Sequence, residues 1–266
     1  MSETRRNFLK LGSATLFGLG AGGAITTLVH QGANASSTPA EGKGIRWGMF
    51  IDMTKCADGC TDCMQACHTT HNVPQVDIPK EEMKWVWKQD YHQVFPSKTH
   101  EFASEKLNGK GVLTICNHCA EPPCVKVCPT QATFQRKDGI VEMDFHRCIG
   151  CRFCMAGCPY GARSFNWRDP RLYLKSFSRE YPTREPGVVE KCNFCAERVG
   201  TDRQPACVET CPEKALVFGD LNDPDSEIRM HLRKRITRTR KPELGARPSV
   251  FYAFGEDSGT SGEAQG

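Results

Sequence analysis

The sequence predicts an α+β fold made of duplicated modules that depend on cross-links more than on a large apolar core. The chain has 266 residues, and the 39% that count as hydrophobic include sixteen cysteines. Roughly a third of the chain is therefore left to build an ordinary core. The cysteines fall into four groups of four, and three groups share one local pattern. Where apolar burial is scarce, metal or covalent cross-links usually supply the missing stability.

The amino-terminal segment has the parts of a twin-arginine export signal. Arg5 and Arg6 precede Phe-Leu-Lys, an apolar Gly/Ala-rich stretch covers residues 11–29, and Ala33-Asn-Ala35 offers a cleavage site. We expect residues 1–35 to be a signal peptide and residues 36–46 a linker. The alternative is an uncleaved membrane anchor, which the five glycines within the stretch disfavour.

This signal predicts a periplasmic protein that is exported folded, with its cofactors already inserted. After residue 35 no segment approaches the 18 to 20 apolar residues of a membrane-spanning helix, so we expect a peripheral protein held at the membrane by partner subunits. The formal net charge of +4 includes the basic signal and does not indicate nucleic-acid binding.

The spacing of the cysteines is typical of iron-sulfur cluster binding. The third group reads C-x2-C-x2-C-x3-C-P, the run found in bacterial ferredoxins. Two-residue gaps let a tight loop wrap three thiolates around one cluster, while the next cysteine, fixed by proline, points to a neighbouring cluster. In chain order the groups are Cys56, Cys60, Cys63 and Cys67; Cys116, Cys119, Cys124 and Cys128; Cys148, Cys151, Cys154 and Cys158; Cys192, Cys195, Cys207 and Cys211.

An internal repeat supports this grouping. The pattern C-x3-C-P-x2-A begins at Cys124, Cys154 and Cys207 and is followed each time by a phenylalanine, whereas the first group has His68 in place of the proline. Three copies of one local design indicate duplicated modules. After the second group, residues 132–135 and 140–143 flank an Asp-Gly turn, which predicts a small β-hairpin.

Other uses of the cysteines are conceivable. Disulfides suit an even count in an exported protein, and the fourth group alone could pass for a zinc ribbon. The repeat favours iron-sulfur clusters over both. Covalent haem needs C-x-x-C-H, which is absent from the sequence.

Several runs resemble the four-cluster iron-sulfur subunits of the molybdopterin-oxidoreductase and NrfC-like families. They are Cys116-Asn-His-Cys119-Ala-Glu-Pro-Pro-Cys124, Cys148-Ile-Gly-Cys151-Arg-Phe-Cys154 and Lys191-Cys192-Asn-Phe-Cys195, and the likeness runs over residues 47–254. The resemblance implies one domain over residues 47–255 with two pseudo-symmetric ferredoxin-like modules. Residues 116–159 would hold one pair of clusters. In the sequence they would be nested between residues 47–70 and 190–220, which together hold the other pair. It also implies insertions at 68–115 and 160–191, a C-terminal arm and a disordered tail at 256–266.

The resemblance further implies four [4Fe-4S] clusters in which the last cysteine of each group is exchanged. The implied ligand sets are Cys56, Cys60, Cys63 with Cys211; Cys192, Cys195, Cys207 with Cys67; Cys116, Cys119, Cys124 with Cys158; and Cys148, Cys151, Cys154 with Cys128. The sequence departs from the family pattern at Cys56-Ala-Asp-Gly-Cys60, where the usual two-residue gap has three residues. The loop that carries Cys56 and Cys60 is thus one residue longer than the family pattern implies.

Within the family, the extra residue and the stretch from His71 to Lys88 are similar to DsrO, the periplasmic subunit of the DsrMKJOP membrane complex that accompanies sulfite reductase. This similarity implies an NrfD-like quinone-reactive membrane subunit as partner, with a multihaem cytochrome c as a further candidate. We expect a non-catalytic wire between such partners, since the sequence has no nucleophile–base arrangement or P-loop. The alternatives are a soluble periplasmic polyferredoxin and an enzyme that reduces a small substrate at an open cluster.

Some residues outside the cysteine groups invite a functional interpretation. We expect His68, His71, His100 and His118 to be hydrogen-bonded groups near the cluster loops. Residues 84–88 alternate as on a strand with one face buried, and the basic run at 233–241 is typical of a solvated face or a docking surface.

Overall fold

The computed structural model of the chain describes residues 44–98, 107 and 109–255. The predicted signal peptide, most of the linker, His100 and the predicted tail lie outside these residues. None of the helices in the described part of the chain is long and apolar enough to cross a membrane.

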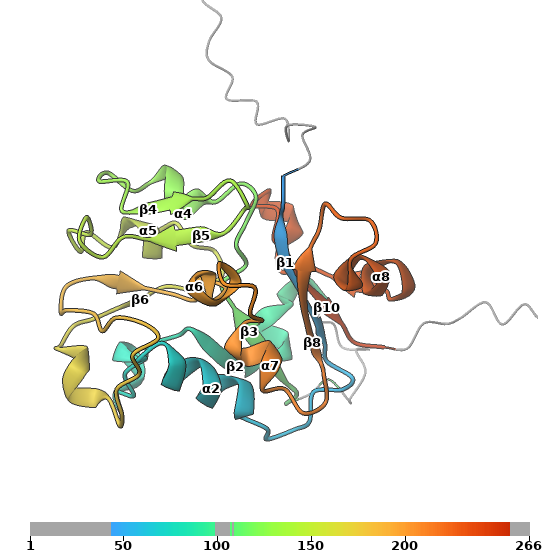
Figure 1. The fold of residues 1–266 in the computed structure, drawn as a ribbon, viewed down its shortest axis with the longest axis horizontal. Helices are drawn as coiled ribbons and strands as arrows, with labels where there is room; N and C mark the ends of the chain where they lie inside the picture. Colours follow the sequence, from blue (N-terminus) through green and yellow to red (C-terminus); the bar gives the residue numbers. More distant parts are fainter. Residues whose placement is uncertain (1–43, 99–106, 108, 256–266) are drawn as a thin grey trace, which may run out of the picture. The chain divides into compact units, whose positions relative to one another are not determined.

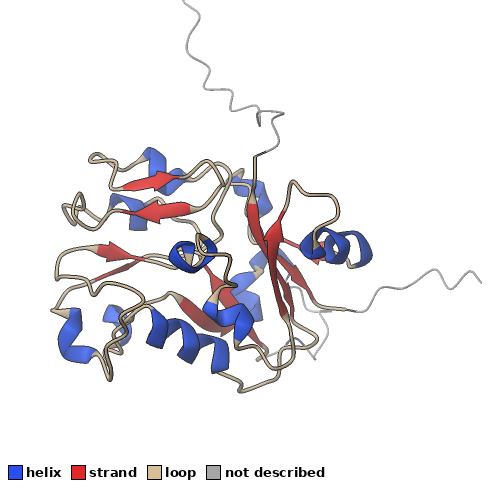
Figure 2. Cartoon of the chain, viewed as in Figure 1, coloured by secondary structure: helices blue, strands red, loops and turns tan. Residues whose placement is uncertain are grey.

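The described chain is built of short helices and short strands (Figures 1 and 2). The strands are β1 (Trp47–Asp52), β2 (Val86–Asp90), β3 (Gly111–Ile115), β4 (Thr133–Gln135), β5 (Val141–Met143), β6 (Ser164–Phe165), β7 (Val189–Glu190), β8 (Leu216–Asp220), β9 (Thr237–Arg238) and β10 (Val250–Ala253). The α-helices are α2 (Asp62–Thr70), α3 (Tyr91–Val94), α4 (Pro123–Lys126), α5 (Phe153–Ala156), α6 (Ala196–Val199), α7 (Ala206–Glu209) and α8 (Glu227–Lys234). Short 3₁₀ turns are η1 (Pro79–Glu81), η2 (Pro96–Lys98), η4 (Pro170–Tyr173) and η5 (Pro242–Leu244).

A four-stranded sheet in the order β8-β1-β10-β9 joins segments that are distant in sequence. Strand β1 pairs antiparallel with β8, with Ile51 opposite Leu216, and parallel with β10, with Ile51 opposite Tyr252. The prediction of a C-terminal arm is therefore wrong. The C-terminal strand is an inner strand of this sheet, because it pairs with β1 on one side and β9 on the other, and Val250, Tyr252 and Ala253 are completely buried.

The predicted hairpin is confirmed, since β4 pairs antiparallel with β5 and Phe134 lies opposite Glu142. Gly139 has a positive φ of 84° in the turn, a backbone conformation that glycine adopts without steric cost. The strand predicted at residues 84–88 also exists, as β2 paired with β3. The face predicted to be buried is buried, since Trp85 and Trp87 belong to the main core cluster. On the opposite face Val86 is buried as well, whereas Lys84 and Lys88 are partly exposed.

The basic run at 233–241 is not a uniform solvated face. Arg235 forms an ion pair with Asp52 at 3.1 Å. Arg240 is buried against the Tyr160 ring, and Lys241 donates a hydrogen bond from Nζ to the Pro159 carbonyl at 2.7 Å. Arg240 and Lys241 thus fix the turn after α5, whereas Arg235 is bound to the end of β1.

A buried ion pair between Arg184 and Glu190 ties three segments together. Arg184 Nε donates to Glu190 Oε2 at 3.0 Å, and Trp85 Nε1 donates to the same oxygen at 2.7 Å. The guanidinium also donates to the carbonyl of Asn72 at 2.8 Å, just beyond the end of α2. Both charged side chains are fully excluded from solvent. The network fixes β7 and β2 against the C-terminal end of α2.

Arg184→Met should lower the free energy of unfolding by about 3–5 kcal/mol, because it leaves the Glu190 carboxylate buried without its partner. Equilibrium urea unfolding of the cluster-loaded protein measures the change. Arg168→Met, which breaks the exposed pair with Glu81 at 2.9 Å, is the matched control and should have a far smaller effect.

The double variant Arg184→Met with Glu190→Leu should be more stable than Arg184→Met alone, since no unpaired charge remains buried. Equal stability of the two variants would contradict the role given to the ion pair.

Candidate metal centre

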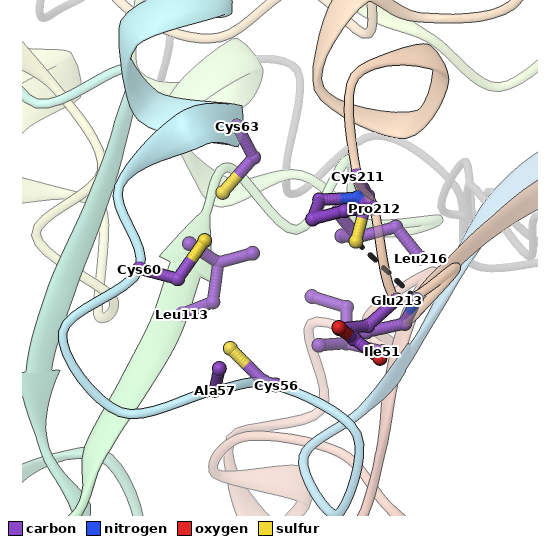
Figure 3. A pocket seen from close by; sticks show the side chains of 11 residues that line it. Ile51, Cys56, Ala57, Cys60, Cys63, Leu113, Cys211, Pro212, Glu213 and Leu216 are labelled. Carbon is purple, nitrogen blue, oxygen red and sulfur yellow. Dashed lines mark hydrogen bonds between the residues drawn. The ribbon is translucent and has the colours of Figure 1, made fainter.

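Four cysteines from two distant parts of the chain line one cavity. Cys56 and Cys60 lie on the loop between β1 and α2, Cys63 lies in the first turn of α2, and Cys211 follows α7. Figure 3 shows the four sulfurs turned toward a common space. The three-residue gap between Cys56 and Cys60 thus still leaves both residues on the cavity wall.

A second set gathers around the C-terminal half of α2 and is more deeply buried. Burial raises the pKa of the Cys67 thiol well above its usual value, and the neighbouring thiols of Cys192, Cys195 and Cys207 raise it further. All four residues are buried. The last cysteine of the first sequence group therefore lies with three members of the fourth group.

A third set lines another cavity. Cys116, Cys119, Cys124 and Cys158 face it, together with Tyr160 and Arg163. Cys116 and Cys119 follow β3 directly, Cys124 lies in α4, and Cys158 follows α5. Cysteines of the second and third sequence groups thus meet here.

The fourth predicted set is only partly brought together by close contacts. The pKa of Cys154 is raised by burial and then, among its neighbours, by the thiols of Cys124 and Cys148, while Arg163 opposes the rise. Cys151 lies on the same loop as Cys148 and Cys154. Cys128 follows α4, which packs on α5. The place of Cys128 in this set stays a prediction.

The four sets form an unbroken row. Cys63 and Cys67 lie one turn apart on the same face of α2 and link the first set to the second. The thiol of Cys192 is close enough to that of Cys116 for the two to interact electrostatically, which links the second set to the third. Cys124 and Cys154 link the third to the fourth in the same way.

The two ends of the row are more exposed than its middle. Among the cysteines predicted for the first and fourth sets, only Cys63 and Cys154 are buried, and the others are partly exposed. In the two middle sets every cysteine except Cys158 is buried. The row therefore reaches the surface at its ends.

The repeated C-P-x2-A pattern has a structural role that the sequence reasoning missed. The residue before each alanine, Gln131, Gly161 or Lys214, has a positive φ between 47° and 63°. This left-handed residue turns the next backbone N–H back toward the cysteine. Ala215 N lies 3.3 Å from Cys211 Sγ, and the N–H groups of Ala132 and Ala162 act on Cys128 and Cys158 in the same way. Donors to sulfur favour the thiolate form.

Two buried cations near the sulfurs were also missed. Arg163 Nη2 lies 3.1 Å from Cys124 Sγ and 2.7 Å from Thr133 Oγ1, and its charge also acts on Cys154. Lys191 is buried, and its Nζ donates to the Cys192 carbonyl at 2.8 Å. The sequence offered only the positions of these residues as a signal. Arg163 directly follows the second copy of the C-P-x2-A pattern, and Lys191 directly precedes Cys192.

The histidine predictions are confirmed at two positions. His71 Nε2 lies 2.7 Å from Glu197 Oε1, and its Nδ1 lies 3.0 Å from the Cys67 carbonyl oxygen. His118 Nδ1 accepts a hydrogen bond from the Val141 N–H at 3.0 Å, and its ring stacks on Phe194. Both rings therefore brace the loops around buried cysteines.

The residues present suit a cluster ligated by thiolates. All sixteen cysteines lie in the described part of the chain and are free thiols. Burial raises the pKa of Cys63 and of Cys192 to about 12, so unligated thiols here would remain protonated. Bound iron would reverse this preference, because a metal cation stabilises the thiolate. Converging sulfurs, backbone donors and a buried Arg163 are the environment that such a group requires.

Comparisons with known proteins agree with this chemistry. The 4Fe-4S dicluster domain family matches residues 111–173 and 176–221. The Hdr-like menaquinol oxidoreductase iron-sulfur subunit 1 of Archaeoglobus fulgidus is 38% identical over 94% of this chain and 97% of its own. A tetrathionate reductase subunit of Salmonella typhimurium is 34% identical, with 97% and 91% covered. Protein NrfC of Escherichia coli is 34% identical, with 81% and 85% covered. The chain belongs to the NrfC-like family of 4Fe-4S iron-sulfur subunits.

Proposed function

We propose that the chain relays electrons through four [4Fe-4S] clusters between a quinone-linked membrane subunit and a cytochrome or catalytic partner. The observation that carries the proposal is the unbroken row of cysteine sets with partly exposed ends. Each bound cluster would supply a site that takes up and gives back one electron. The two buried middle sets keep the path inside the protein, and the ends bring it within reach of other chains.

For the ligands we propose the four exchanged sets implied by the family resemblance. Shared cavities support the sets completed by Cys211 and Cys158, and thiol–thiol interactions support the set completed by Cys67. The set completed by Cys128 is supported by the packing of α4 on α5. Exchange places one cysteine of each group in the neighbouring set, which holds adjacent clusters at short range.

The chain's own residues would set how readily each site accepts an electron. Backbone N–H groups and the Arg163 guanidinium stabilise added negative charge on the sulfurs. Surrounding apolar side chains such as Ile51, Leu113 and Leu216 limit water around the first set. Because these groups are already oriented, little reorganisation accompanies a change of charge.

For partners we propose an NrfD-like integral membrane subunit and a multihaem cytochrome c, in a periplasmic complex of sulfur-compound respiration. Two relatives are named as subunits of a menaquinol oxidoreductase and of a tetrathionate reductase, which supports a quinone link and a sulfur substrate. The DsrO-type assignment rests on the Cys56–Cys60 spacing and the stretch after His71.

Replacing both signal arginines tests the location. Arg5→Lys with Arg6→Lys should keep the chain in the cytoplasm at full precursor length, because the twin-arginine pathway reads the arginine pair. Cell fractionation followed by mass spectrometry measures this, with Lys10→Arg as the control that should still be exported. Unchanged export of the double variant would contradict the proposed route.

The exchange of cysteines is tested with single serine variants. Cys211→Ser and Cys56→Ser should alter the same EPR signal, and the double variant should lose no more than that one cluster, because both residues serve the first set. Cys207→Ser should alter a different signal. If Cys211→Ser instead matches Cys207→Ser, the cysteines are not exchanged. Zinc or no metal in the anaerobically purified wild type would rule out the electron relay itself.

Arg163→Met should lower the midpoint potential of the clusters next to Cys124 and Cys154, because reduction adds negative charge where a cation has been removed. Loss of a hydrogen bond to a charged group predicts a shift of roughly 60–120 mV for one electron. An EPR-monitored redox titration measures it. Arg163→Lys keeps the charge and should shift the potential less, whereas equal shifts for both variants would contradict a charge effect.

A further inference from the structure

The two exposed ends of the cysteine row differ in the surface around them. At the first end, the exposed residues of the cavity wall are Ala57, Pro212 and Glu213, with Lys55 and Asp58 beside them on the same loop. The described loops at residues 54–62 and 210–214, which form this end, carry no large exposed apolar side chain. This end is small and polar.

The fourth set is surrounded instead by large apolar side chains. Ile149 and Phe153 alternate with the cysteines of the loop and are 67% and 60% exposed. Val127 precedes Cys128, and Trp167 follows β6; they are 40% and 51% exposed. We call Val127, Ile149, Phe153 and Trp167 the apolar collar.

The collar is held in place by local packing. The Arg152 guanidinium lies 4.7 Å from the Trp167 ring centre, and Trp167 meets Phe165 edge to face at 4.7 Å between centroids. Gly150 runs so close to Gly187 that a Cβ there would lie 2.4 Å from the Gly187 oxygen. A Cβ added at Gly157, just after α5, would lie 3.1 Å from Val127 Cγ2, so these two positions are close. Packing therefore fixes Trp167, Val127 and the backbone beside Ile149.

The composition of this surface matches the centre of a lasting protein interface. Tryptophan, phenylalanine and arginine are enriched in such centres, and permanent interfaces are more apolar than transient ones. The flanks carry exposed ion pairs, Arg147 with Asp144 at 3.5 Å and Lys126 with Glu121 at 3.3 Å. Arg152 adds a third cation at the surface. A complementary face would be apolar at its centre and polar at its rim.

We propose that the apolar collar is the docking surface for a permanently bound redox subunit. This subunit covers the collar with an apolar face of its own and carries its cofactor directly beneath that face. The proposal rests on the proposed function, because only a partner that exchanges electrons gains from covering the end of the cysteine row. The polar first end lacks comparable anchors, so it suits a partner that binds and leaves.

The test uses the full chain in membranes of its own cells, solubilised in mild detergent. A photo-crosslinking benzoylphenylalanine is placed at Phe153 on α5. The control position is Met230 on α8, which is also exposed; Figure 1 shows α8 on the opposite side of the body from α5. Mass spectrometry should identify, from position 153 only, a chain that binds haem, flavin or an iron-sulfur cluster.

A functional readout accompanies the cross-link. Phe153→Ser with Trp167→Ser should slow reoxidation of the pre-reduced chain by the solubilised membranes by at least about tenfold, the effect of about 1.4 kcal/mol of lost binding. Met230→Ser should change this rate less than about twofold. Cross-links to a second copy of this chain, to lipid, or equally from both positions would overturn the proposal, and so would an unchanged rate in the double variant.

Iron and sulfide content separates this inference from the proposed function. Both variants should hold as much iron and sulfide as the wild type, because no substituted residue is a proposed ligand. A wild type with full iron content that never cross-links at Phe153 refutes the docking surface and leaves electron transfer standing. A wild type without iron refutes the proposed function itself.

Discussion

The close approach of buried cysteine sulfurs is the constraint that the rest of the structure satisfies. Cys211 reaches a cavity formed by residues 56–63, and Cys67 lies among residues 192–207, so contacts across about two thirds of the described chain must form together. Strands β1 and β8, which flank these residues, pair directly. The sheet and the sulfur sets thus secure the same long-range connection. A chain with so thin an apolar core needs this second source of stability.

The close approach of buried sulfurs also requires that the negative charge of their thiolates be compensated. Thiolates in a buried site are costly unless donors or cations compensate them. The left-handed turns at Gln131, Gly161 and Lys214 supply backbone donors, and Arg163 supplies a buried cation between two sets. The Arg184–Glu190 pair is neutral as a unit and lies apart from this scheme. It braces the segments that carry the buried second set and adds no net charge to the interior.

Local features of the structure were predictable because local spacing determines them. The four cysteine groups, the hairpin of β4 and β5 and the strand at β2 all follow from patterns within a few residues. The C-terminal strand was not predictable in the same way, because its pairing with β1 joins residues about 200 positions apart. Likewise nothing near Arg240 in sequence reveals that Tyr160 covers it. The roles of Arg163 and Lys191 also depend on partners from distant segments.

The exchange of cysteines between groups was predictable only in part. The repeat indicated paired modules, but which groups pair became an expectation only through the family resemblance. The structure adds the order of the sets along α2 and through Cys192 and Cys116. It also adds the difference in exposure between the ends and the middle, which depends on how separate loops pack.

Anomalous diffraction at the iron absorption edge from crystals grown without oxygen would test the central claim most directly. We predict four iron clusters in one row, in the order of the sets completed by Cys211, Cys67, Cys158 and Cys128, with the first and last near the surface. Fewer than four clusters, a zinc signal in their place, or a cluster order that separates Cys192 from Cys116 would contradict the account.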